Sequence, residues 1–310
     1  MTPLFALRDG RRRVAHAALV AAVGLALVLA GAPLLGVHEL PQRVAPGRYD
    51  LADLASALRH ARPEAAGARY DYAALRRDPA PLERFVAALA NVGPRTTPER
   101  FPDRASRLAY ALNAYNALIL AAVLAHGVRE SVHEVRGPLE PTPGFGFFWA
   151  LKLRVDGART NLFVYEHDVI RAFGDARIHA ALNCASVSCP ALRSEPFRPE
   201  TLDAQLDAAM KDMVAGERHV AVDAEGVALS AIFDWFEEDF AANARRSGLA
   251  PPKPHELVRT GWVLAFLQAY ADPAKAEAIG RATSVRYRAY DWSLNDTALD
   301  HTARDGPPRR

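Results

Sequence analysis

Both cysteines of the chain lie in one stretch of mostly small residues, from Ile178 to Leu192, which also carries His179. The histidine precedes Cys184 by five residues, and Cys189 follows Cys184 by five more. Cysteine and histidine at this spacing could supply a thiolate nucleophile and its general base, a disulfide, or part of a metal site. No other segment of the sequence concentrates as many groups that can do chemistry.

Several interpretations of Cys184 and Cys189 stay open, inert packing among them. A disulfide is favoured outside the cytoplasm, and closing so short a loop would stabilise the fold by about 2 kcal/mol. A nucleophilic Cys184 would take His179 or His167 as its base. Glu166 or an asparagine would then orient that base, and the site would suit cleavage of amides or esters, or acyl transfer. A metal site is disfavoured because C-x4-C with one histidine lacks a second pair of ligands.

The segment before the cysteines decides what could face them. His179 and Asn183 share one side of residues 178–183 whether these are helical or extended, because four residues make about one helical turn or two strand repeats. Asp175 is a candidate N-cap for a short helix here, and the small residues after Leu182 favour a turn. Since the turn begins at Cys184, its thiol could fold back toward His179 and Asn183.

Glu166 lies in a predicted helix that begins after Asn161 and ends at Gly174. The residues at helical spacing around it are all apolar: Leu162, Phe163, Val169 and Ile170. A carboxylate on an apolar face is unusual, and we expect it to be mostly buried and bonded to a cation or to backbone donors. A catalytic role and a buried ion pair without catalytic function both fit this pattern. His167 points about 100° away from Glu166 on a helix and need not contact it.

Two asparagines lie on another predicted helix, which starts near Pro102 and Asp103 and stops at Gly127. Asn116 falls among apolar residues at helical spacing, so its amide should be at least partly buried and must find hydrogen-bond partners. Asn113 and Asn116 either tie loops to the helix or orient a substrate, and Asn183 shares the second possibility.

The remaining periodicities predict an α+β fold with mixed helices and a small antiparallel sheet. Fold-level analogy to papain-like and transglutaminase-like enzymes is what suggests amide or ester substrates. Hairpins are expected around Asp156-Gly157 and around residues 223–226, and a strand is expected from Val285. Further helices are expected at residues 51–61, 82–90, 199–213 and 260–270, with one more from Ser230, whose aromatic residues we assign to the core.

The N-terminus predicts a location outside the cytoplasm. Arg11 to Arg13 precede an apolar run from Val14 to Val37 that is long enough to cross a bilayer. An uncleaved anchor is favoured, although Ala30-Gly31-Ala32 also permits cleavage as a signal peptide. We therefore divide the chain into an anchor or signal peptide (1–40), a linker with an N-terminal helix (41–69), a single domain (70–296) and a disordered tail (297–310).

Composition excludes several partners. The chain has 310 residues, 50% hydrophobic, with a formal net charge of only +2. Its arginines are scattered, so nucleic acid is not an expected partner. Nucleotide-binding glycine motifs, Gly-x-Ser-x-Gly and His-Glu-x-x-His are all missing from the sequence, and no cofactor or metal is predicted. The expected partners are a membrane, through residues 14–37, and a peptide or envelope substrate.

Four strings of the sequence carry a resemblance to a family. They are Leu-Asn-Ala-Tyr-Asn-Ala-Leu at 112–118, Glu166-His167 followed by Ile170-Arg171, the stretch from Arg177 to Leu192, and Tyr-Asp-Trp-Ser-Leu-Asn at 290–295. In this order they resemble the domain-of-unknown-function 547 family over about residues 70–295. One departure is Asn161-Leu-Phe-Val-Tyr before Glu166, where the family tends to be more acidic. The resemblance implies no assigned reaction.

Two functions from different classes remain. The first is an extracytoplasmic cysteine-dependent hydrolase or acyltransferase acting on amide or ester bonds. The second is a membrane-anchored binding module in which a Cys184–Cys189 disulfide is structural. Convergence of Glu166, His167, His179 and Cys184 in one concave site would favour the first.

Overall fold

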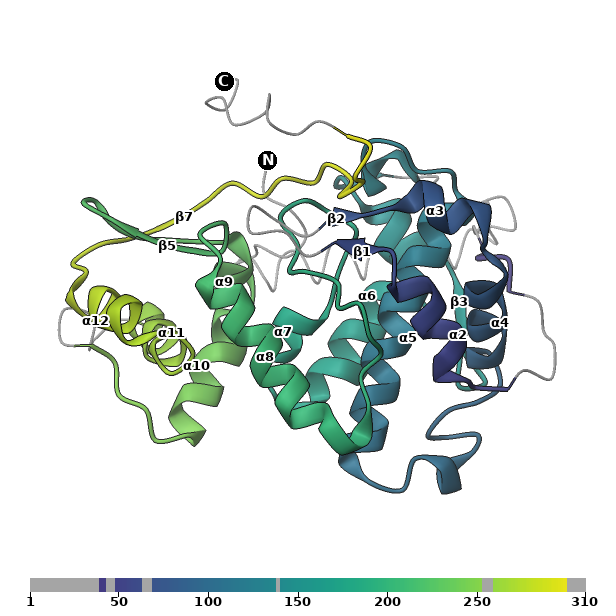
Figure 1. The fold of residues 1–310 in the computed structure, drawn as a ribbon, viewed down its shortest axis with the longest axis horizontal. Coiled ribbons are helices and arrows are strands. Elements are labelled where there is room, and N and C mark those ends of the chain that lie inside the picture. The colour runs from purple at the N-terminus through teal and green to yellow at the C-terminus, as the bar shows by residue number, and fades with distance from the viewer. Residues whose placement is uncertain (1–38, 43–47, 63–68, 138–139, 253–258, 300–310) are drawn as a thin grey trace, which may run out of the picture.

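The computed structural model describes residues 39–42, 48–62, 69–137, 140–252 and 259–299. Within these ranges the chain forms two adjoining hydrophobic cores, each built from helices and a short hairpin or sheet (Figure 1). The predicted α+β class is confirmed. The predicted membrane segment, residues 14–37, and the tail from residue 300 lie outside the described residues.

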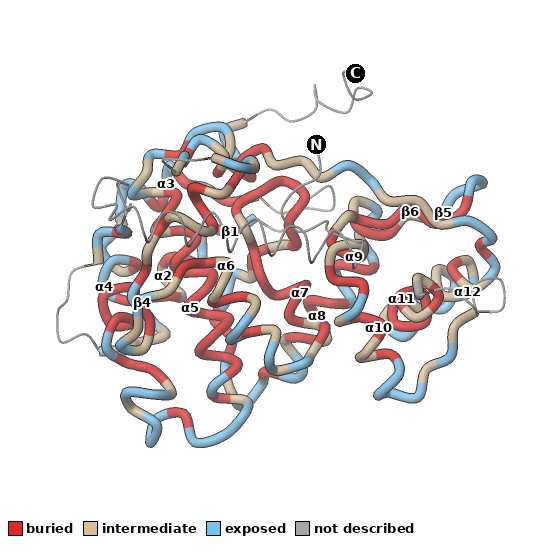
Figure 2. Tube along the Cα trace, turned by 180° about the vertical axis from the view of Figure 1, so that it is seen from behind, coloured by how far each residue is buried: buried red, intermediate tan, exposed pale blue. Residues whose placement is uncertain are grey.

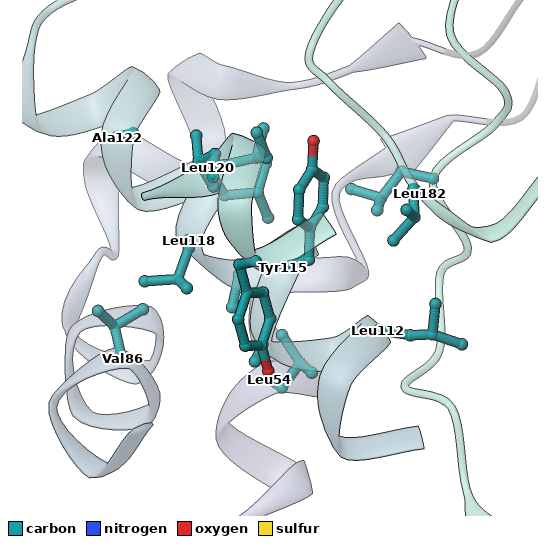
Figure 3. Close-up of a cluster of buried hydrophobic side chains, with 14 of the residues drawn as sticks. Leu54, Val86, Leu112, Tyr115, Leu118, Leu120, Ala122 and Leu182 are labelled. Atoms are coloured by element: carbon teal, nitrogen blue, oxygen red, sulfur yellow. The ribbon is translucent and has the colours of Figure 1, made fainter. Parts of the chain in front are cut away.

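The first core is organised around α5 (Arg104–Ala125), which is buried along most of its length (Figure 2). Asp103 caps it through the backbone N–H of Ser106, whose hydroxyl in turn contacts the Asp103 backbone. Helix α4 (Ala80–Leu89) packs against it, and α2 (Leu51–Leu58) packs against α4. Figure 3 shows Tyr115 and Leu118 of α5 among side chains from these neighbours. Although α5 is long and apolar enough to cross a membrane, its apolar residues are core residues here.

A hairpin and an irregular helix follow in the first core. The hairpin predicted at Asp156-Gly157 is confirmed, with β3 (Leu153–Val155) antiparallel to β4 (Ala158–Thr160). The predicted helix after Asn161 also forms and ends at Gly174, which has φ +65°. It is not a uniform α-helix: α6 (Leu162–Val164) continues as a π-helix, η4 (Tyr165–Ile170), and then a 3-10 turn, η5 (Arg171–Phe173).

The second core lies on the C-terminal side of the chain. Strand β6 (Gly226–Leu229) pairs antiparallel with β5 (Val220–Asp223), as predicted, and parallel with β7 (Val285–Tyr287). This sheet is therefore mixed instead of purely antiparallel. The helices that contribute to this core include α8 (Leu202–Ala215), α10 (Glu237–Arg246), α11 (Arg259–Gln268) and α12 (Pro273–Arg281), of which α12 was not predicted.

Two short helices connect the cores. Helix α7 (Ile178–Ala181) contributes Ile178 to the first core and Ala180 to the second, and α9 (Ala231–Trp235) leads into α10. After β7 the chain returns to the first core (Figure 1, yellow), where Asn295 accepts a hydrogen bond from the N–H of Tyr70 at 2.8 Å. This returning segment also covers the cysteine loop.

The described part of the chain begins next to the border between the predicted anchor or signal peptide (1–40) and the predicted linker. Leu40 is buried in the first core, and its N–H donates to the carbonyl of Lys152 at 2.9 Å. Leu40 is a single apolar residue between Glu39 and Pro41 and gave no periodic signal from which this packing could be read. The other short elements are β1 (Ala61–Arg62), β2 (Arg69–Tyr70), α3 (Tyr72–Arg77), η1 (Pro98–Arg100), η2 (Val132–Glu134), η3 (Gly146–Ala150) and η6 (Pro199–Thr201).

Candidate functional site

A pocket lies where the two cores meet. It holds about 470 Å³ of space that no atom fills, a figure that includes solvent at its open mouth. Glu166, His179 and Cys184 line it, whereas His167 does not. The other lining residues are Tyr115, Phe148, Leu182, Cys189, Pro190, Ile232, Trp235, Phe236, Tyr290 and Trp292.

Cys184 and Cys189 are joined in a disulfide, with their Cα atoms 6.1 Å apart. The disulfide interpretation is confirmed. Both cysteines line the pocket, where Cys184 is half-buried and Cys189 is buried. In this oxidised form neither sulfur is a thiol, so a nucleophilic Cys184 would require reduction of the bond first.

Hydrogen-bond donors surround both sulfurs. The Tyr290 hydroxyl lies 3.1 Å from each Sγ atom, and the Cys184 backbone N–H donates to Cys189 Sγ at 2.9 Å. Burial raises the pKa of Tyr290, so its hydroxyl keeps its proton at neutral pH. Such donors would stabilise negative charge on either sulfur after reduction.

The cysteine loop has a second tie besides the disulfide. Asn183 accepts from the N–H of Ala185 at 2.9 Å and donates to the carbonyl of Pro190 at 2.8 Å, so its amide spans the loop. Ala185 has φ +64°, a left-handed conformation that residues with a Cβ adopt at a cost of about 1–2 kcal/mol. The sharp reversal after Cys184 is therefore held by both the disulfide and Asn183.

The two helical asparagines bind backbone groups of neighbouring loops. Asn116 donates to the carbonyl of Ala181 at 2.9 Å and accepts from the N–H of Asn183 at 3.0 Å. Asn113 makes the same pair of bonds with the backbone of Phe197, at 2.8 and 2.9 Å. Each amide thus fixes a loop to α5, and Asn116 sets the position of the segment that precedes Cys184.

His179 is buried and held in one orientation. Its ring stacks on Phe236 at 4.0 Å between centroids, and Nε2 lies 2.8 Å from Asp239 Oδ2. Among the described residues, Nδ1 has no hydrogen-bond partner, and the side chain lines the pocket. With Nε2–H donating to Asp239, Nδ1 carries the lone pair that a general base needs.

Asp239 also binds Arg171 through both carboxylate oxygens, at 2.7 and 3.0 Å. Burial opposes ionisation of Asp239, but hydrogen bonds from His179 and Arg171 outweigh it and hold the pKa of Asp239 well below its usual range. Burial lowers the pKa of His179 despite this carboxylate. His179 is accordingly a neutral imidazole beside an ionised aspartate at pH 7.

Glu166 is 7% exposed, so its predicted burial is confirmed. The predicted partner, a cation or backbone donors, is wrong. The Tyr115 hydroxyl instead donates to Oε2 of Glu166 at 2.9 Å. Burial raises the pKa of Glu166 to about 7, even though the Tyr115 bond and the charge of Arg171 lower it. Glu166 is therefore near half ionisation at neutral pH.

The π-helix explains where Glu166 points. In η4 the N–H of Arg171 bonds to the carbonyl of Glu166, five residues back, instead of four. The extra residue in this turn changes the angular spacing on which the sequence interpretation of the face relied. Single π-turns of this kind are frequent at functional sites.

His167 has a different environment from the other candidates. Its Nδ1 lies 3.1 Å from the carbonyl of Phe163, and its ring stacks on the Phe163 ring at 3.9 Å. Burial lowers the pKa of His167 to about 4. Of the two histidines considered as a base, only His179 lines the pocket, and Asp239 occupies the orienting position considered for Glu166. Asp239 was missed because it lies 60 residues from His179 on another helix.

An aromatic wall, which we define as Trp235, Tyr290 and Trp292, lines the pocket beside the disulfide. Tyr290 lies 4.8 Å from Trp235 and 4.5 Å from Trp292 between ring centroids. The sequence pattern assigned the aromatic residues near 235 to the core, which is confirmed for Phe233, Phe236 and Phe240, and Trp235 packs against that core and also lines the pocket. The string at 290–295 was noted only as part of the family resemblance.

Among the residues that the structure describes, no group of three histidine, cysteine, aspartate or glutamate side chains is arranged to hold a metal ion. The chemistry available in the pocket is that of the disulfide, a neutral imidazole paired with a carboxylate, a near-neutral carboxylic acid and a tyrosine hydroxyl.

Comparison with known proteins supports the resemblance in the central part of the chain. Residues 99–214 match the family DUF547, described as "Protein of unknown function, DUF547". The matched segment holds Glu166, His179 and both cysteines, but ends before Asp239 and the aromatic wall. No curated protein and no solved structure matches the chain.

Proposed function

We propose that the DUF547 segment and the helices that complete its pocket form a cysteine-dependent hydrolase or acyltransferase for amide or ester bonds of peptide or envelope substrates. One observation carries the proposal: His179 is held by Asp239 at 2.8 Å and lines the same pocket as Cys184. A nucleophile, a base and a carboxylate that orients the base are the parts that acyl transfer by a cysteine requires.

The reaction starts from the reduced protein. A dithiol reductant attacks the more exposed sulfur, Cys184, and Cys189 leaves as a thiolate that Tyr290 and the Cys184 N–H can stabilise. The second thiol of the reductant then releases Cys184 and becomes oxidised to a cyclic disulfide. Both cysteines are now thiols, and the oxidised form is a resting state.

Acylation and deacylation follow with all protons accounted for. His179 Nδ1 takes the proton of the Cys184 thiol as sulfur attacks the substrate carbonyl carbon, and then gives this proton to the departing amine or alcohol. Water attacks the resulting thioester while His179 again accepts a proton, which returns to Cys184 as the acid leaves. An acceptor amine or alcohol in place of water gives acyl transfer.

We also propose that this site faces the periplasmic side of a membrane. The support comes from the apolar run 14–37 after three arginines, and from a disulfide, which persists in oxidising compartments. Fractionation of cells that make the full chain tests this: recovery in the membrane supports an anchor, and a soluble chain starting near residue 33 indicates cleavage.

Ester hydrolysis tests the catalytic proposal. The full chain, reduced with dithiothreitol, should release p-nitrophenol from p-nitrophenyl acetate, and the oxidised chain should not. Cys184→Ser should abolish the reaction while Cys189→Ser retains it, because Cys184 is the more exposed of the two cysteines that line the pocket. Loss in both variants alike, or activity in Cys184→Ser, would contradict the proposal.

The disulfide itself favours a second candidate, a binding module that never uses a thiol. In that case the reduced chain shows no turnover, and ligand binding is the same in the oxidised and reduced forms. The ester assay therefore separates the two functions.

A further inference from the structure

One oxygen of a buried carboxylate is left for a ligand. Tyr115 bonds to Oε2 of Glu166, and no hydrogen bond from a described residue reaches Oε1. Glu166 is 7% exposed and lines the pocket, so Oε1 is available only to a molecule inside it. An ionised carboxylate at this depth is costly unless a cation accompanies it.

The charges around the pocket do not supply that cation. No lysine or arginine is among the described residues that line it. The charge of Arg171 lowers the pKa of Glu166, but its guanidinium is bonded to both oxygens of Asp239, so the two charges cancel. With His179 neutral, ionised Glu166 leaves one uncompensated negative charge.

Aromatic side chains make up much of the remaining lining and suit a cation. Trp235, Tyr290 and Trp292 form the aromatic wall, and Phe148 and Phe236 also line the pocket. Aromatic faces attract cations, tryptophan most strongly, and such cages recognise quaternary ammonium groups.

We propose that the pocket binds the quaternary ammonium group of a small ligand between Glu166 and the aromatic wall, and that this group is part of the substrate. The last clause rests on the proposed function, whereas the binding itself does not require a thiol. Substrates would then carry a trimethylammonium-like group close to the amide or ester bond.

Binding should depend on pH through Glu166. The groups that face or influence it are Tyr115 on α5, His179 on α7, Asp239 on α10, Arg171 after η4 and Tyr290 on the returning segment. Tyr115 and Tyr290 keep their protons at neutral pH, because burial raises the pKa of both, and the Arg171–Asp239 pair stays charged. Since the cation requires ionised Glu166, affinity should rise about tenfold from pH 6 to pH 8.

Calorimetry on the oxidised full chain tests the proposal with three probes. Choline is the cation, 3,3-dimethyl-1-butanol is its neutral isostere, and ethanolamine is the primary amine. We expect choline to bind at least about tenfold more tightly than either of the others at pH 8. Equal binding of the isostere, tighter binding of ethanolamine, or binding of none of the three would overturn the proposal.

Variants assign the effect to the two sides of the pocket. Glu166→Gln should remove the preference for choline over its isostere and the dependence of choline binding on pH. Trp235→Leu should weaken choline binding about tenfold. Matched controls are Glu237→Gln, a buried glutamate bonded to Thr260, and Trp262→Leu, which faces Arg245; neither residue lines the pocket. Persistence of the preference in Glu166→Gln would refute the assignment.

Failure here and failure of the proposed reaction are distinguishable. The calorimetry uses the oxidised chain, in which no thiol exists, and the ester assay uses an uncharged acyl group. Hydrolysis without choline binding would reject the ligand class alone, and choline binding without hydrolysis would reject the reaction alone.

Discussion

The two sides of the pocket come from different parts of the chain and contribute different things. The family-matched wall consists of lining residues within 99–214, and it carries the groups that could react: Glu166, His179 and the disulfide. The C-terminal wall consists of Ile232, Trp235, Phe236, Tyr290 and Trp292, with Asp239 behind it. Reactive groups on one wall are thus oriented and enclosed by the other, so the matched segment alone does not make a complete site.

Removing the carboxylate behind the C-terminal wall should have the largest effect. Asp239→Ala leaves the Arg171 guanidinium and the buried His179 without their partner, and we expect it to destabilise the protein by about 4 kcal/mol. Urea denaturation of the oxidised chain measures this. The control is Asp212→Ala, which breaks an exposed ion pair with Arg193 and should cost less than about 1 kcal/mol. Equal losses would mean that the C-terminal wall does not hold His179.

Glu166 should make stability depend on pH in a direction opposite to that of an ordinary paired carboxylate. Its pKa is about 7 in the folded chain and about 4.5 when unfolded, so the folded state binds more protons between these values. Stability therefore falls as pH rises from about 4.5 to 7 and then levels off. Glu166→Gln removes this dependence. Its free energy of unfolding, relative to that of the wild type, should therefore increase by about 3 kcal/mol from pH 4.5 to pH 8. If the difference in stability between the variant and the wild type is the same at pH 4.5 and pH 8, the pKa of Glu166 is not raised in the folded chain.

Opening the loop of the family-matched wall should have a smaller effect. Cys184→Ser and Cys189→Ser each remove the disulfide and should destabilise the chain by about 2 kcal/mol, because the bond closes a short loop. Reduction of the wild type should lower its stability by a similar amount. The fold should persist, since Asn183 still ties Ala185 to Pro190. A collapse of the fold on reduction would mean that the reduced state cannot be a working form.

The smallest effect concerns the contact between Tyr115 and Glu166. Tyr115→Phe should lower the free energy of unfolding by about 1–2 kcal/mol. It should also raise the pKa of Glu166 above about 7, because Glu166 loses the hydrogen-bond donor that favours its ionised form. Tyr110→Phe is the matched control, since its buried hydroxyl donates to the carbonyl of Val92 and not to an acid. Nuclear magnetic resonance titration of the glutamate carboxyl carbons separates the two variants.

Local patterns predicted much of the fold. The apolar repeat and the Asp103 cap located α5, and Asp156-Gly157 located the β3–β4 hairpin, because these signals depend on neighbouring residues alone. The π-turn at Glu166 and the parallel pairing of β7 with β6 could not be predicted in this way. Both depend on packing between segments that are distant in sequence.

The candidate site likewise contains residues that local sequence predicts and residues that only the fold brings in. Glu166, His179 and Cys184 were found because each stands out against its immediate neighbours. Asp239 and Tyr290 were missed, since their roles arise from contacts made 60 and 106 residues away. An acidic residue on the charged helix α10 gives no signal of its own, and only the folded chain brings it to His179.

The alkylation of Cys184 tests the central claim most directly. In the reduced full chain, the rate of reaction with iodoacetamide is measured against pH for each cysteine by peptide mass spectrometry. We predict that Cys184 reacts faster than Cys189 and with a midpoint below the ordinary thiol pKa of about 8.5, and that His179→Ala and Asp239→Asn both slow it without unfolding the protein. Equal rates for the two cysteines, an ordinary midpoint and no effect of either variant would contradict a nucleophile activated by the His179–Asp239 pair.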